Sequence, residues 1–218
     1  MLEKGRTMGT DDAIDVWLSI GSTYAYLTVM RLADVERAAG VRFRWRPFNV
    51  RAIMRDMDNI PFATKPVKAA YMWRDIQRRA AMYGFPARVP APYPLQAFDV
   101  ANRVAVLGAQ EGWCADYARA TYRRWFQQGL AAGSEPNLSQ SLREIGQDPQ
   151  RVITQAAGDA IGQAYDAATE AARGLGIFGV PTFVVRGELF WGDDRLDDAI
   201  SWHRYGQLWA LPATGPGA

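Results

Sequence analysis

The sequence predicts an α/β protein in which a small sheet is assembled from both ends of the chain. Apolar and polar residues alternate over 14–18 and again over 41–46, and a helical pattern lies between them. The alternating pattern returns only after Pro181. We therefore expect a β-α-β unit, a long all-helical insertion and a terminal β-β-α unit, with the two ends of the chain meeting in one sheet.

The first unit follows a start, residues 1–11, that we expect to be disordered. The strand pattern of 14–18 ends at Gly21, and a helix with one apolar face runs from there to Gly40. Arginines alternate with apolar residues in the second strand, 41–46. A helix of this length suits a right-handed crossover between two parallel strands.

Helical patterns fill most of the middle of the chain. They are interrupted by residues 85–95, which hold four prolines and are expected to form a loop. We expect helices over 50–56, 67–83, 98–112, 113–130, 138–145, 150–157 and 159–173.

A hairpin and a last helix complete the sheet. Strands over 182–186 and 189–191 flank Gly187-Glu188 as the turn. Asp193 or Asp194 is expected to cap a helix that runs to about Arg204.

The element order divides the chain into two parts. A discontinuous sheet domain is expected over 12–60 and 172–210, and a helical insertion domain over 61–171. The Pro/Gly-rich tail, Pro212–Ala218, is expected to be mobile.

The composition is that of a globular protein without a charged polymer as partner. The chain has 218 residues, of which 49% are hydrophobic, and a formal net charge of +2. This charge gives no sign of a surface for nucleic acid or for a membrane. The first twelve residues are polar and lack the apolar region of a secretory signal, so a cytoplasmic location is expected.

The counts of cysteine and histidine restrict the chemistry. Cys114 is the single cysteine, which excludes an intramolecular disulfide, dithiol redox activity and Cys-rich metal sites, and we expect no metal. His203 is the single histidine, and a G-x-S-x-G turn is absent, which argues against a Ser-His-Asp hydrolase.

Ser22 directly follows the first strand and is a candidate site residue. Serine is a common N-cap, and that role alone would explain it. A helix N-terminus also favours an anion, because its N–H groups are unpaired. The segment Ser22-Thr23-Tyr24-Ala25 stands where a thioredoxin-like protein carries Cys-x-x-Cys, so both redox cysteines are missing. A serine cannot exchange disulfides, but its hydroxyl can donate a hydrogen bond to a thiolate of another molecule.

Val180-Pro181 opens the third strand. A trans proline is ordinary at the start of a strand. The segment nevertheless resembles the cis-proline loop of thioredoxin-like proteins, and we expect a cis bond. The backbone N–H and C=O of Val180 are then expected to be free to pair with an extended peptide.

Two polar segments allow both a structural and a functional interpretation. Asp193, Asp194 and Arg195 suit an acidic helix start, or a nest that grips an amino-acid-like end of a ligand. Asn59 and Lys68 suit a polar surface loop, or a clamp that offers amide hydrogen bonds and a point charge.

The ordered set of segments resembles the 2-hydroxychromene-2-carboxylate isomerases and the related kappa-class glutathione transferases, in the DsbA-like branch of the thioredoxin superfamily. The resemblance covers about residues 13–205, and Thr23 departs from it because many relatives have proline there. The segments that carry it are Ser22-Thr23-Tyr24-Ala25-Tyr26-Leu27, Arg46-Pro47-Phe48, Asn59-Ile60-Pro61, Lys68 with Tyr71-Met72, Phe178-Gly179-Val180-Pro181-Thr182 and Phe190-Trp191-Gly192-Asp193-Asp194-Arg195-Leu196.

The resemblance implies glutathione as the cofactor. Ser22 would hydrogen-bond to its sulfur and lower a thiol pKa that is ordinarily about 8.5. Val180, held by Pro181, would pair with the cysteinyl part. The γ-glutamyl end would lie against Asp193, Asp194 and Arg195, and the glycyl side against Asn59. Lys68 would face either glutathione or the second substrate.

The resemblance also implies isomerase chemistry on an intermediate of aromatic degradation. Conjugate addition of the thiolate turns a double bond single, rotation follows, and elimination restores the cofactor. The implied substrate interconverts between a ring-closed chromene and an open benzylidenepyruvate. Its pocket needs aromatic walls and a cation for the carboxylate, which the sequence does not assign to particular residues.

Two other functions fit the same residues. A kappa-like glutathione transferase would use the same site on a small electrophilic substrate, and a non-catalytic thioredoxin-like binding module would also lack both cysteines. The relatives are usually dimers, so we expect a homodimer.

Overall fold

The computed structural model describes residues 13–59, 62 and 64–208. The start and tail of the chain that we expect to be mobile, residues 1–11 and 212–218, lie outside the described residues. So do residue 12 and residues 209–210, at the ends of the expected sheet domain, and Ile60-Pro61 of the quoted loop.

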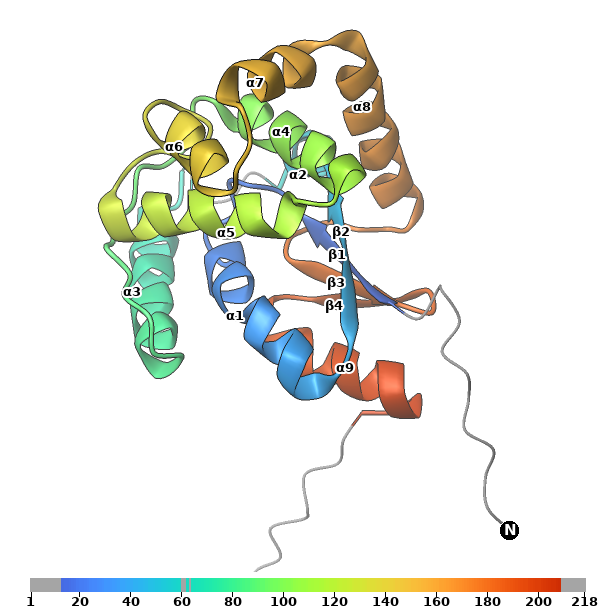
Figure 1. The fold of residues 1–218 in the computed structure, drawn as a ribbon. Helices are drawn as coiled ribbons and strands as arrows, with labels where there is room; N and C mark the ends of the chain where they lie inside the picture. The colour runs from blue at the N-terminus through green and yellow to red at the C-terminus, as the bar shows by residue number, and fades with distance from the viewer. Residues whose placement is uncertain (1–12, 60–61, 63, 209–218) are drawn as a thin grey trace, which may run out of the picture.

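A four-stranded mixed sheet lies at the centre of the molecule (Figure 1). Its strands are β1 (Ala13–Leu18), β2 (Arg42–Pro47), β3 (Thr182–Val185) and β4 (Glu188–Trp191), in the order β2-β1-β3-β4. β1 pairs parallel with β2 and antiparallel with β3, which pairs antiparallel with β4. The expected α/β fold, with both ends of the chain in one sheet, is confirmed.

Alternation along β1 gives the sheet two covered faces. Ile14 and Val16 are fully buried and pack with residues of α1 (Ala25–Ala39) and α9 (Leu196–Tyr205). Burial of each such side chain stabilises the fold by roughly 1.5–3 kcal/mol. The other face is covered by α4 (Phe98–Glu111) and α8 (Asp159–Gly174), which contact β2. Figure 1 shows α4 and α8 together on one side of the sheet, with α1 and α9 on the other side.

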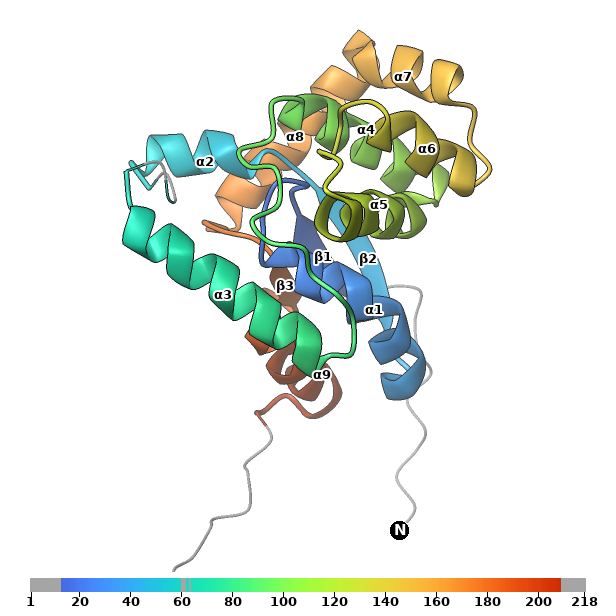
Figure 2. The same ribbon diagram turned by 90° about the vertical axis from the view of Figure 1, so that its left-hand side faces the viewer.

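The remaining α-helices follow the expected helical segments. They are α2 (Val50–Asp56), α3 (Pro66–Met82), α5 (Cys114–Arg123), α6 (Asn137–Glu144) and α7 (Pro149–Ala157). Figure 2 shows the loop between α3 and α4 passing over the start of α1. The Tyr26 hydroxyl donates to the Pro86 carbonyl, which ties this loop to α1.

The interpretation of Ser22 as the N-cap of α1 is wrong. The helix begins at Ala25 and has no side-chain cap. Ser22 lies in a turn closed by its own N–H, which donates to the Ser19 carbonyl at 3.2 Å, so the helix starts only after this turn. The Ser22 side chain is thereby left available for a contact elsewhere.

The expected helix over 113–130 differs at its C-terminal end. After α5 the chain forms a π-helical turn, η1 (Arg124–Gln128), which ends at Gly129 with φ +75°. The consecutive residues Trp125 and Phe126 are both fully buried in this turn. The wider turn brings two neighbouring aromatic side chains into one core, which a regular α-helix does less easily.

The hairpin turn and the start of the last helix both differ from the expected positions. The hairpin turn consists of Arg186 and Gly187, with φ +53° and +86°, instead of Gly187-Glu188. Positive φ at both central residues matches the twist of the strands. A 3₁₀ turn, η2 (Asp193–Arg195), precedes α9, and neither aspartate caps that helix. Asp193 fails to cap because its carboxylate is turned toward α1.

Candidate active site

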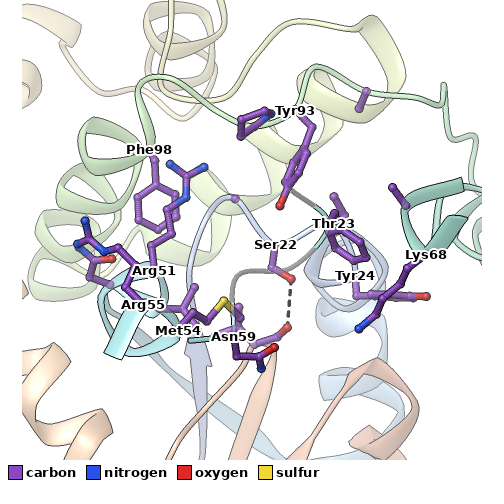
Figure 3. Close-up of a pocket in the computed structure, with 18 of the residues that line it drawn as sticks. Ser22, Thr23, Tyr24, Arg51, Met54, Arg55, Asn59, Lys68, Tyr93 and Phe98 are labelled. Carbon is purple, nitrogen blue, oxygen red and sulfur yellow. Dashed lines mark hydrogen bonds between the residues drawn. The ribbon is translucent and has the colours of Figure 1, made fainter. Parts of the chain in front are cut away.

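A cavity of about 860 Å³ lies where the β1–α1 loop, α2, α3 and the loop before β3 come together (Figure 3). Its walls combine aromatic rings with basic side chains. The aromatic residues are Tyr24, Phe62, Trp73, Tyr93, Phe98, Phe178 and Trp191, and the basic residues are Arg51, Arg55 and Lys68. Such a lining suits a planar organic anion.

Ser22 and Val180 meet at the wall of this cavity. The Val180-Pro181 bond is cis, as expected. The Ser22 hydroxyl donates to the Val180 carbonyl at 3.1 Å, drawn as the dashed line in Figure 3. Both backbone groups of Val180 are left unpaired by the sheet, as expected, and the carbonyl accepts from the Ser22 side chain instead. The Val180 N–H donates to none of the described residues.

Buried neighbours hold the β1–α1 loop in place. The hydroxyl of Tyr122, a fully buried residue of α5, donates to the Ser22 carbonyl at 3.0 Å. The Thr23 hydroxyl turns inward to the Met72 sulfur at 2.9 Å. Gly21 has φ +141°, and a Cβ there would lie 2.6 Å from the Phe98 ring. The loop therefore has little freedom to move Ser22.

Asn59 and Lys68 both line the same cavity. The Asn59 backbone N–H donates to the Met54 carbonyl at 2.8 Å, which places its side chain beside α2. Lys68 is exposed on α3, with its Nζ 5.9 Å from the centre of the Phe62 ring. The structure thus brings Ser22, Asn59, Lys68 and Val180 around one cavity.

Pro181, Asp193, Asp194 and Arg195 do not line this cavity. Pro181 is buried behind Val180. Asp194 and Arg195 are about half exposed and pair with each other at 3.0 Å. Their expected contact with glutathione stays a prediction, because they lie beside the cavity and not on its wall.

Asp193 is engaged inside the protein. Its residue exposure is 4%, and one carboxylate oxygen accepts from the Thr28 hydroxyl at 2.9 Å and from the Arg31 Nε at 3.2 Å. The other oxygen accepts from the Tyr83 hydroxyl at 3.0 Å. This carboxylate joins α1 and the end of α3 to η2, so it acts on a ligand at most through the position of its neighbours.

Two cavity residues that the sequence did not single out are Arg51 and Tyr93. The Arg51 guanidinium lies 3.9 Å from the centre of the Phe98 ring and donates to the Leu95 carbonyl at 3.1 Å. Burial lowers the pKa of Arg51, and burial raises the pKa of Tyr93 while Arg51 opposes that rise. Tyr93 stands in the proline-rich loop, where no periodic pattern marks it as a site residue.

Cys114 does not reach the cavity. It is the first residue of α5 and is buried, and burial raises the pKa of its thiol. The chain therefore presents no thiol of its own to Ser22. Within the described part of the chain, no three histidine, cysteine or acidic side chains are grouped to hold a metal. The same part has no helix whose length and hydrophobicity would carry it across a membrane.

Comparison with known proteins places the chain among thioredoxin folds. The family described as DSBA-like thioredoxin domain matches residues 13–200. A 2-hydroxychromene-2-carboxylate isomerase of Pseudomonas putida is 26% identical over 185 residues, which cover 84% of this chain and 90% of that protein.

Solved structures agree with this placement. A structure of 2-hydroxychromene-2-carboxylate isomerase superposes with a TM-score of 0.75 at 26% identity, covering 84% of this chain and 90% of that one. A probable DsbA oxidoreductase of Streptomyces coelicolor has a TM-score of 0.69 at 20% identity over 94% of this chain and 96% of its own, which shows the shared fold.

Proposed function

Because the chain belongs to the family of DSBA-like thioredoxin domains, we propose that it is a glutathione-dependent isomerase of the 2-hydroxychromene-2-carboxylate type. The distant similarity to such isomerases extends over most of the chain. Within this fold, the position of the redox cysteine is held by Ser22.

One observation supports the proposal most directly. The Ser22 hydroxyl lies 3.1 Å from the Val180 carbonyl, at the wall of an aromatic cavity that contains no cysteine. A hydroxyl in this place can steady a thiolate but cannot form a disulfide. The reactive sulfur must then come from a bound molecule.

The residues present fit a thiol-bearing peptide such as glutathione. The Val180 N–H has no partner among the described residues, and the carbonyl of the same residue accepts from the Ser22 hydroxyl. When the hydroxyl turns toward a sulfur, the Val180 carbonyl is released as well. Both backbone groups can then pair with an extended peptide as a short strand.

Bound glutathione would supply a thiolate that adds reversibly to a conjugated alkene, so that rotation about the resulting single bond can precede elimination of the sulfur. Ser22 keeps the sulfur charged at neutral pH by donating a hydrogen bond to it. Phe98, Trp73 and Tyr93 exclude water around the alkene. The composition of the substrate is unchanged, and the new geometry of its double bond decides whether the ring can close.

Replacement of Ser22 by alanine tests the proposal. We expect Ser22→Ala to fold, to bind glutathione, and to lose about 10²-fold in kcat/KM, the usual loss for one hydrogen-bond donor to a reacting anion. The measurement is the ultraviolet absorbance of the bound thiolate across a pH series, together with turnover of a benzylidenepyruvate. Ser139→Ala, a partly exposed residue of α6 whose hydroxyl donates to Glu135 and which does not line the cavity, is the control.

Full turnover in Ser22→Ala, or no binding of glutathione to the wild-type protein, would contradict the proposal. Mass analysis of the product separates the isomerase from a transferase. An unchanged mass agrees with isomerisation, whereas a stable thioether adduct would assign a kappa-like transferase.

A further inference from the structure

We propose that Arg51 and Tyr93 form the subsite for the 2-oxo-acid end of an aromatic substrate, with Arg51 holding the carboxylate and Tyr93 donating to the 2-oxo oxygen. This inference rests on the proposed isomerase function and names the residues that select its second substrate. It follows from the surroundings of the two side chains.

Arg51 is a half-buried cation without an ion pair. Its exposed fraction is intermediate, and none of the salt bridges between described residues includes it. Its one hydrogen bond to another described residue goes from Nη1 to the Leu95 carbonyl, and its guanidinium lies over the Phe98 ring. The remaining N–H groups of the guanidinium fork are thus left for a carboxylate, which the fork can bind through two parallel hydrogen bonds.

The acidic residue next to Arg51 is occupied by other partners. Asp99 also lines the cavity, and its carboxylate accepts from the Tyr165 hydroxyl at 3.4 Å and from the Asn49 amide at 3.5 Å. It contributes to the electrostatic environment of Arg51 but forms no salt bridge with it. An anionic ligand therefore does not have to displace a carboxylate from Arg51.

Tyr93 directs a second donor into the same space. Its hydroxyl points into the cavity toward Ser22 in Figure 3, and it donates to none of the described residues. The charge of Arg51 acts on this hydroxyl. The Trp73 and Tyr93 rings form a T-shaped pair with centroids 6.1 Å apart, which restricts the rotation of the Tyr93 side chain.

The three groups stand in the order that a 2-oxo acid requires. Ser22 marks the place of the sulfur, Tyr93 points toward it, and Arg51 lies farther out against Phe98 (Figure 3). A conjugated aromatic 2-oxo acid has its reacting carbon, its 2-oxo oxygen and its carboxylate in the same sequence. Negative charge that develops on the 2-oxo oxygen would meet the Tyr93 hydroxyl, beside a cation.

The test uses phenylpyruvate and phenylacetone, which share the ring and the ketone and differ in the carboxylate. In the keto form neither has a conjugated alkene, so neither undergoes conjugate addition of a thiol. Their affinities are measured by calorimetry with the full-length protein saturated with glutathione. We expect the wild-type protein to prefer phenylpyruvate, and Arg51→Met to bind it about 10- to 100-fold more weakly while phenylacetone is unaffected.

Three further variants sharpen the comparison. Arg51→Lys keeps the charge but loses the planar fork, so part of the preference should return. Tyr93→Phe should weaken both ligands by a similar factor, about 5- to 10-fold, because both carry the ketone. Arg74→Met removes an equal charge from α3 outside the cavity and should change neither affinity.

Several results would overturn the assignment. The assignment is wrong if the wild-type protein does not prefer phenylpyruvate to phenylacetone, a result that does not depend on whether the variants fold. It is also wrong if Arg74→Met loses as much affinity for phenylpyruvate as Arg51→Met. Weaker binding of glutathione to Arg51→Met, with phenylpyruvate unaffected, would assign Arg51 to the cofactor's own carboxylate. If glutathione does not bind the wild-type protein but phenylpyruvate still depends on Arg51, the proposed function fails and the subsite stands.

Discussion

At the scale of single residues, the hydroxyl of Tyr122 is expected to affect how well the Ser22 hydroxyl stabilises a bound thiolate. It holds the Ser22 carbonyl at 3.0 Å and the Ser19 carbonyl at 3.3 Å. Tyr122→Phe should cost about 1 kcal/mol of folding free energy, the usual contribution of one hydrogen bond. It should also raise the apparent pKa of bound glutathione, because the Ser22 hydroxyl is less firmly directed. Ultraviolet titration of the thiolate measures this pKa.

Tyr117→Phe is the matched control for that titration. Tyr117 is another fully buried tyrosine of α5, but its hydroxyl bonds to neither Ser19 nor Ser22. An equal pKa rise in both variants, or no rise in Tyr122→Phe, would show that the hydrogen bond to the loop does not act on the sulfur.

Residues beside a strand end were predictable from sequence, and residues defined by distant contacts were not. Ser22 follows the first strand pattern and Val180 precedes the third. Antiparallel pairing of these two strands therefore brings the two residues together. The importance of Arg51 depends on the Phe98 ring and on the absence of an acidic partner, neither of which its own segment reveals. Asp193 looks like a cap in the sequence, yet its partners come from α1 and α3.

At the scale of elements, η2 contains two adjacent aspartates with different expected roles. Asp193 should matter mainly for folding stability, and Asp194 for the binding of glutathione. Asp193→Ala leaves the Arg31 guanidinium, whose side chain is 14% exposed, without its carboxylate, which typically costs about 3–5 kcal/mol for a buried pair. Asp194→Ala breaks a half-exposed pair with Arg195 and should cost under about 1 kcal/mol. Urea denaturation measures both values, and glutathione calorimetry follows on the folded variants.

Glutathione calorimetry and urea denaturation of Asp194→Ala together decide whether Asp194 binds the cofactor. We expect Asp194→Ala to bind glutathione more weakly while its unfolding midpoint stays near that of the wild type. Unchanged glutathione affinity would remove Asp194 from the cofactor site, and a small stability loss in Asp193→Ala would contradict the anchoring role of its carboxylate.

Elements were predicted reliably where one periodic pattern governed them. β1, β2, the helices from α2 to α4 and the helices from α6 to α8 appear close to the expected residues, because each buries one regular face. The π-helical turn after α5 and the 3₁₀ turn η2 were not predicted. Each forms to satisfy a tertiary contact, burial of Trp125 and Phe126 in the first and inward rotation of Asp193 in the second.

At the scale of the whole molecule, the sheet and the helical insertion share one core. Fully buried side chains of β1 and α1 belong to the same cluster as those of α4, α5 and α6. Asn102 of α4 accepts from the Ile20 N–H at 2.7 Å and donates to the Ile20 carbonyl at 2.9 Å. We propose that the division expected at residues 61 and 171 describes the path of the chain and not two independently stable units.

A shared core predicts one cooperative unfolding transition. Urea curves followed by far-ultraviolet circular dichroism, which reports mainly the helices, and by tryptophan fluorescence should coincide. Asn102→Ala should lower both midpoints together, because it leaves the buried backbone groups of Ile20 without partners at a cost of roughly 1–3 kcal/mol each. Saturating glutathione should raise both midpoints together, since a ligand of the folded state stabilises everything that unfolds with its site. Separate transitions, or an Asn102→Ala effect confined to the dichroism signal, would show that the insertion unfolds on its own.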